Sequence, residues 1–94
     1  MPDILDELQA IIAERKKNPR TGSYTNRLLD EGRARIAQKV GEEATEVVVA
    51  ALAQGRKEQI GEMCDLLYHL LVLMAELDIS MYDVFEELEH RHKK

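Results

Sequence analysis

A single glycine, Gly55, separates two long stretches of helical hydrophobic periodicity, and this junction limits the possible folds more than any other feature. The stretches cover residues 33–54 and 57–77, and each repeats apolar side chains with the spacing of an α-helix. A joint this short leaves the second helix no path except back along the first. We therefore predict an antiparallel helical hairpin at the centre of the protein.

Three further helices are expected around this hairpin. One covers about residues 3–17, a short one follows Ser23 as its N-cap and ends near Gly32, and the last begins after Ser80, with Asp83 placed to complete a capping box. No stretch shows the alternation of a strand. The expected fold is all-α, with about five helices in a single domain, residues 1–94, and a core like that of a four-helix bundle.

The second helix of the hairpin is apolar around most of its circumference, which is more surface than the rest of a 94-residue chain easily covers. We expect a second copy of the chain to cover it, so that homodimerisation completes the core. Met63, Met74 and Met81 would fill the core or the interface, and the aliphatic neighbours of Cys64 predict a buried thiol.

The charge of the chain argues against polyanionic partners. The formal net charge is −5 and the pI is about 5.2, which disfavours nonspecific binding to nucleic acid or to a membrane surface. The charge is unevenly divided, because residues 1–41 hold eight basic against six acidic side chains and residues 42–94 hold five against twelve. Such a division suits a binding site that has basic side chains on one side and carboxylates on the other.

No membrane or secretory segment is expected. The most apolar stretch, residues 66–75, is too short to span a bilayer and contains His69. The first ten residues carry early acids and lack the pattern of a secretory signal. A lone cysteine is compatible with a reducing cytosol but does not fix the compartment.

Two pairs of acids are predicted to face one another across the hairpin. Glu43 and Glu46 are three residues apart, as are Glu62 and Asp65, so each pair occupies one helix face. Measured along the helices from the turn, Glu46 and Glu43 lie at about 13 and 18 Å, and the other two acids at about 10 and 15 Å. Four converging carboxylates require neutralisation, and oxygen ligands suit Mg²⁺, with Mn²⁺ as the other candidate.

A simpler interpretation exists for the first motif. The pattern EExxE, formed by Glu42, Glu43 and Glu46, is common on solvated helix faces. Its combination with ExxD on the next helix, at a matching height across a one-glycine turn, favours a metal site instead.

These motifs resemble a known family. EExxE followed by ExxD is similar to the all-α nucleoside-triphosphate pyrophosphatases, the MazG-like superfamily. The segments GSYTNRLLDEG, IAQKVGEEATE and EMCDLLYHLLVLM resemble, within it, the phosphoribosyl-ATP pyrophosphohydrolases. The resemblance covers about residues 4–80. It implies magnesium-dependent hydrolysis of phosphoribosyl-ATP to phosphoribosyl-AMP and pyrophosphate, the second step of histidine biosynthesis, in a cytosolic homodimer. Without a cyclohydrolase domain, the chain is expected to perform this hydrolysis only.

The resemblance also implies roles for individual residues. Glu43, Glu46, Glu62 and Asp65 would be metal ligands, and Glu42 would be an acid beside them or the base that orients water, although the division between Glu42 and Glu43 stays open. Lys39 would contact phosphate or pair with the nearby acids. Substrate contacts are implied for Ser23, Tyr24 and Thr25, of which the first two are also explained by capping and packing.

Several other polar residues have two interpretations. The arginines could bind phosphate groups or be simply solvated, and the sequence does not rank Arg20, Arg27, Arg33 and Arg35. His69 follows Asp65 by one turn, which makes it a core histidine or a contact of a metal ligand.

Two other functions remain open. The same set of metal-binding acids could belong to a housekeeping pyrophosphatase that acts on ordinary or damaged nucleoside triphosphates. The acids could also serve only to keep a non-catalytic helical dimerisation module in solution.

Overall fold

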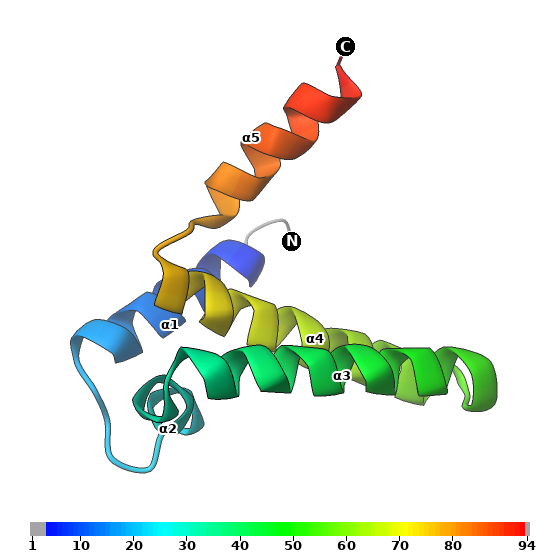
Figure 1. Cartoon of the computed structure of the whole chain (residues 1–94), viewed down its shortest axis with the longest axis horizontal. Helices are drawn as coiled ribbons and strands as arrows, with labels where there is room; N and C mark the ends of the chain where they lie inside the picture. Colours follow the sequence, from blue (N-terminus) through cyan, green and yellow to red (C-terminus); the bar gives the residue numbers. More distant parts are fainter. Residues whose placement is uncertain (1–3, 94) are drawn as a thin grey trace.

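Five helices make up the fold, as the sequence predicts. The computed structural model describes residues 4–93, which form α1 (Ile4–Lys17), α2 (Tyr24–Glu31), α3 (Arg33–Ala53), α4 (Arg56–Leu77) and α5 (Met81–His92) (Figure 1). Within this range there is no β-strand, and the all-α prediction is confirmed. The predicted start of the first helix at Asp3 lies outside the described residues. No helix of residues 4–93 is both long and apolar enough to cross a bilayer.

The predicted hairpin is present, with α3 and α4 running side by side and meeting at a tight turn (Figure 1). The side chain of Gln59 closes this turn, because its Nε2 donates to the carbonyl oxygens of Ala50 and Gln54, both at 3.1 Å. The carbonyl of Ala50 also accepts from the backbone N–H of Gln54 at 3.0 Å, whereas the bond from Gln59 gives the carbonyl of Gln54 a partner at the end of α3. The hairpin therefore has a defined register, and the heights of its acids can be compared directly.

The caps that the sequence predicts are also present. Ser23 Oγ accepts from the backbone N–H of Asn26 at 3.2 Å. Ser80 Oγ accepts from the N–H of Asp83 at 3.2 Å, and the carboxylate of Asp83 accepts from the N–H of Ser80 at 2.8 Å. Each cap satisfies donors at a helix start and so places the first residue of its helix.

The core lies at the end of the hairpin away from its turn. Every helix contributes to it, with Ile12, Leu28, Ile36, Leu71, Val72 and Met81 buried. The half of the hairpin nearer the turn is left uncovered, and its exposed apolar side chains are Val48, Val49, Leu52, Ile60, Met63 and Leu67. Helix α5 extends away from the bundle (Figure 1) and exposes Tyr82, Phe85 and Leu88.

The burial of Cys64 is the prediction that the structure contradicts. Its side chain is exposed. Cys64 precedes Tyr68 by one helical turn, and the core that partly covers Tyr68 stops short of it. Of the methionines, Met81 is buried and Met74 is half-buried against the core, whereas Met63 is exposed on the uncovered half of the hairpin.

Candidate metal and substrate site

Three of the predicted acids converge between α3 and α4. Glu43, Glu62 and Asp65 each offer one carboxylate oxygen, and these oxygens lie within 4.8 Å of one another. Glu43 is only 6% exposed, Glu62 is half-buried and Asp65 is exposed. Three negative charges at such separations repel one another unless protons or a cation neutralise them. The hairpin thus brings together three of the four acids that its geometry predicts to meet, while their role as ligands remains a prediction.

Glu62 carries the clearest sign that this cluster lacks a partner. Its Oε1 is buried and has no hydrogen bond to any of residues 4–93. Burial raises the pKa of Glu62 above its ordinary value, and the negative charge of Glu46 raises this pKa further. Asp65 and Glu43 act on it in the same direction. A buried carboxylate oxygen that has no hydrogen-bond partner and lies near other acids fits a hard divalent cation. Glu46 is exposed and lies outside the group of converging oxygens, but its charge acts on the same carboxyl.

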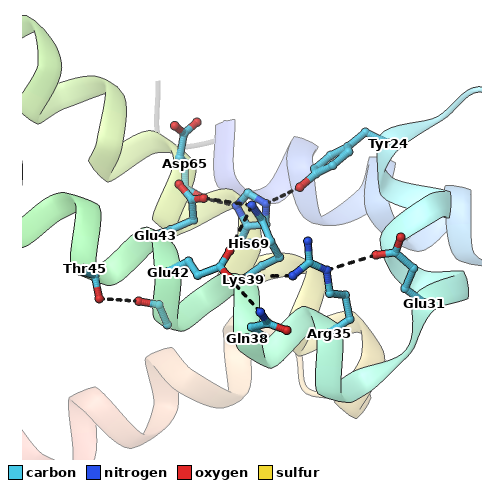
Figure 2. A network of polar contacts seen from close by, with 11 residues as sticks. Tyr24, Glu31, Arg35, Gln38, Lys39, Glu42, Glu43, Thr45, Asp65 and His69 are labelled. Atoms are coloured by element: carbon cyan, nitrogen blue, oxygen red, sulfur yellow. Dashed lines mark hydrogen bonds and ion pairs between the residues drawn. The ribbon is translucent and has the colours of Figure 1, made fainter.

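The structure separates the adjacent acids Glu42 and Glu43. Glu42 is turned towards its own helix, where its carboxylate accepts from Gln38 Nε2 at 3.0 Å and lies 4.0 Å from Arg35 Nη1. Glu43 points instead towards α4 and Asp65 (Figure 2). The geometry therefore favours Glu43 as the ligand of the pair and leaves Glu42 beside the cluster.

Lys39 forms the ion pairs that its spacing predicts. Its Nζ lies 3.4 Å from Glu43 Oε2 and 3.6 Å from Glu42 Oε1 (Figure 2). Burial alone would lower the pKa of Lys39, but the nearby Tyr24 hydroxyl and the two carboxylates outweigh it, so this pKa is raised. Lys39 is thus a cation at neutral pH, next to the acids. Whether it also contacts phosphate stays a prediction.

The segment predicted to contact substrate packs against α4. The hydroxyl of Tyr24 lies 3.0 Å from His69 Nε2, and the ring of Tyr24 is stacked on Tyr68 with centroids 6.2 Å apart. Thr25 is buried, and its hydroxyl is hydrogen-bonded to that of Tyr68. Ser23 is engaged as the cap of α2. His69 is therefore a buried histidine in contact with the segment that is predicted to bind substrate.

The four arginines divide into two groups. Arg33 and Arg35 form ion pairs, each at 3.5 Å, with the half-buried Glu76 and the exposed Glu31 respectively. Arg27 lies over the ring of Tyr24, 5.2 Å from its centroid. Arg20 and Arg27 line a small cavity of about 240 Å³ at the start of α2, whose other lining residues are Thr21, Gly22, Ser23, Asn26 and Asp30. Cationic side chains around a cavity suit an anionic ligand group.

Sequence reasoning missed Asn26. This side chain is only 6% exposed; its Oδ1 accepts from the N–H of Arg20 at 2.8 Å, and its Nδ2 donates to the carbonyl of Arg15 at 2.7 Å. Asn26 thereby ties the loop before α2 to the end of α1. The available signal was its position three residues before Leu29, on the face of α2 that packs against the core.

Comparisons with known proteins agree on one family. The family model described as phosphoribosyl-ATP pyrophosphohydrolase matches residues 5–92. A phosphoribosyl-ATP pyrophosphatase from Sulfurisphaera tokodaii is 53% identical over 91 residues, which are 97% of each chain. One from Metallosphaera sedula is 50% identical over 93 residues, which are 99% of this chain and 100% of the other. The histidine biosynthesis bifunctional protein HisIE of Caldanaerobacter subterraneus is 49% identical over 92 residues, which are 98% of this chain and 45% of that protein. The chain belongs to the phosphoribosyl-ATP pyrophosphohydrolase family.

Proposed function

We propose that this protein hydrolyses phosphoribosyl-ATP to phosphoribosyl-AMP and pyrophosphate, the second step of histidine biosynthesis, and that it requires Mg²⁺. The observation that carries the proposal is the convergence of Glu43, Glu62 and Asp65, with one buried carboxylate oxygen left unpartnered, in a chain of this family. Oxygen donors alone suit Mg²⁺ or Mn²⁺ and do not suit softer metals.

The residues present fit such an ion. Glu43, Glu62 and Asp65 would hold it, and Glu46 would add negative charge at the same place. When bound, a divalent ion supplies positive charge that polarises phosphate oxygens and offsets charge on the departing pyrophosphate. The acids of α3 and α4 contribute by presenting their oxygens from two rigid helices, which limits the rearrangement needed on binding.

The cationic residues have separate tasks in this proposal. Lys39, beside the acids, would pair with the triphosphate as a point charge. Arg20 and Arg27, at the cavity before α2, would hold the ribosyl phosphate at the other end of the substrate. Glu42 is the candidate base that orients water, because it adjoins Glu43 and its own side chain is exposed. Its exposed partners Gln38 and Arg35 would release it at small cost.

A homodimer completes this proposal. The uncovered half of the hairpin exposes a set of large apolar side chains, and a second copy of the chain is the partner that could cover it symmetrically. The reaction would take place in the cytoplasm, where an exposed free thiol such as that of Cys64 remains reduced.

A pyrophosphate-release assay tests the activity. The purified protein would be given phosphoribosyl-ATP and, in parallel, a panel of ordinary and modified nucleoside triphosphates, each with and without Mg²⁺. We expect phosphoribosyl-ATP to have the highest kcat/KM and activity to depend on the metal. Preference for the panel would instead identify a housekeeping pyrophosphatase. A chain that neither turns over any substrate nor binds Mg²⁺ saturably in calorimetry would be a dimerisation module.

A further inference from the structure

A chain of hydrogen bonds crosses the partly buried contact between α2 and α4, and none of the roles above uses it. Tyr24 is the first residue of α2, and its hydroxyl lies 3.0 Å from His69 Nε2. The other ring nitrogen of His69, Nδ1, lies 2.7 Å from the carbonyl oxygen of Asp65 (Figure 2). The side chain of Asp65 belongs to the acid cluster, so one histidine connects the substrate segment with the turn of α4 that carries a candidate metal ligand.

The geometry decides which atoms carry the protons. A carbonyl oxygen can only accept a hydrogen bond, so His69 Nδ1 must be the donor to Asp65. In the neutral ring Nε2 is then an acceptor, and the hydroxyl of Tyr24 donates to it. His69 is only 6% exposed, and its ring meets those of Tyr24 and Tyr68 edge-on, with centroids 5.8 and 5.2 Å away. The ring therefore has one orientation and a defined set of partners.

The connection matters because the two halves of the site are otherwise on separate elements. The acids lie on α3 and α4, whereas the cavity with Arg20 and Arg27 lies on the loop and first turn of α2. A substrate that is held at both places needs them at a constant separation, and small displacements of a positioning element reduce binding or rate considerably.

We propose that Tyr24 and His69 are positioning residues that hold the start of α2 at a constant distance from the acid cluster. This inference rests on the proposed function, since it assumes a substrate that reaches from the acids to the start of α2. The neighbouring bond between Thr25 and Tyr68 keeps α2 packed when the Tyr24 bond is lost, so the loss should loosen the segment without unfolding it.

Tyr24→Phe is the first test, because it removes only the hydroxyl and keeps the ring. The loss of one partly buried hydrogen bond corresponds to about a tenfold change in an equilibrium constant. The segment binds the substrate away from the reacting anhydride, so we expect KM for phosphoribosyl-ATP to rise about tenfold while kcat changes less than about twofold. Tyr82→Phe is the matched control on α5, where KM should not change. An unchanged KM in Tyr24→Phe would overturn the proposal.

Two substitutions of His69 separate positioning from simple packing. His69→Gln can place an amide oxygen near the position of Nε2 and still accept from Tyr24. His69→Asn can place an amide nitrogen near Nδ1, where it donates to Asp65 but does not reach Tyr24. We expect the Asn variant to reproduce the KM of Tyr24→Phe and the Gln variant to stay near that of the wild type. Adding Tyr24→Phe to the Asn variant should then cause no further rise. Equal defects in the Gln and Asn variants would refute the inference.

Two measurements do not depend on turnover. Nitrogen-15 NMR of His69 should show a protonated Nδ1 and an unprotonated Nε2, and amides of residues 20–26 should exchange faster in Tyr24→Phe than in the wild type. A protonated Nε2 in the neutral ring, or unchanged exchange, would contradict the positioning role. If the wild type does not hydrolyse phosphoribosyl-ATP, the proposed function fails, and these two readouts still decide whether the pair holds α2 in place.

Discussion

Replacing Asn26 by alanine should destabilise the protein more than its position in a short helix suggests. The side chain is bonded at 2.8 Å to the N–H of Arg20 and at 2.7 Å to the carbonyl of Arg15. Alanine leaves both groups without these partners, at about 1–3 kcal/mol each if they stay dry. Both groups are only partly buried, so water reaches them in part and the loss should be about 2–3 kcal/mol. For 94 residues this is a large share of about 5–14 kcal/mol of stability.

Urea unfolding followed by circular dichroism measures this effect. A loss of about 2–3 kcal/mol lowers the thermal midpoint of a chain of this size by about 10–20 °C. Asn18→Ala is the matched control, since Asn18 is exposed and its side chain forms one bond, at 3.0 Å, to Glu14; it should cost less than about 0.5 kcal/mol. Asn26→Asp keeps the acceptor for Arg20 but loses the donor to Arg15, so it should fall between the two. Equal stabilities of Asn26→Ala and Asn18→Ala would refute the reasoning.

Three further predictions concern the acids and the uncovered surface. Asp65→Asn should lower Mg²⁺-dependent pyrophosphate release at least about 100-fold without lowering the urea midpoint of the metal-free protein; retained turnover would exclude Asp65 as a ligand. Because the pKa of Glu62 is raised in the folded chain, the native state binds this proton more tightly than the unfolded state, and the contribution of Glu62 to metal-free stability falls as pH rises from about 4.3 through the raised pKa. In urea unfolding, the free energy of unfolding of Glu62→Gln should therefore rise relative to that of the wild type as the pH is raised across that range. A difference between the two proteins that does not change with pH would contradict the raised pKa of Glu62. Leu52 is 84% exposed in the single chain, so Leu52→Lys should shift the proposed dimer towards monomer in sedimentation, whereas Leu88→Lys on α5 should not; a stable Leu52→Lys dimer would place the interface elsewhere.

Local features of the sequence determined the helices and their order. The apolar periodicity of residues 33–54 and 57–77, the single glycine between them and the caps at Ser23 and Ser80 all act within a few residues, so they can be read without the fold. The height of an acid along a helix depends only on its distance in residues from the turn. This is why the convergence of Glu43 with Glu62 and Asp65 could be predicted.

Only the tertiary structure decided which partner each polar side chain meets. Glu42 and Glu43 are adjacent and chemically identical, and they differ because the rotation of α3 against α4 turns one towards Asp65 and the other towards Arg35. Which ring nitrogen of His69 carries the proton is decided by two partners, the carbonyl of Asp65, four residues earlier, and the hydroxyl of Tyr24, 45 residues earlier in the chain. Cys64 is exposed because its side chain lies on a face of α4 that neither α3 nor the buried core covers. Rotation about a helix axis and the extent of a neighbouring element are set by packing across the whole chain, and no local pattern contains them.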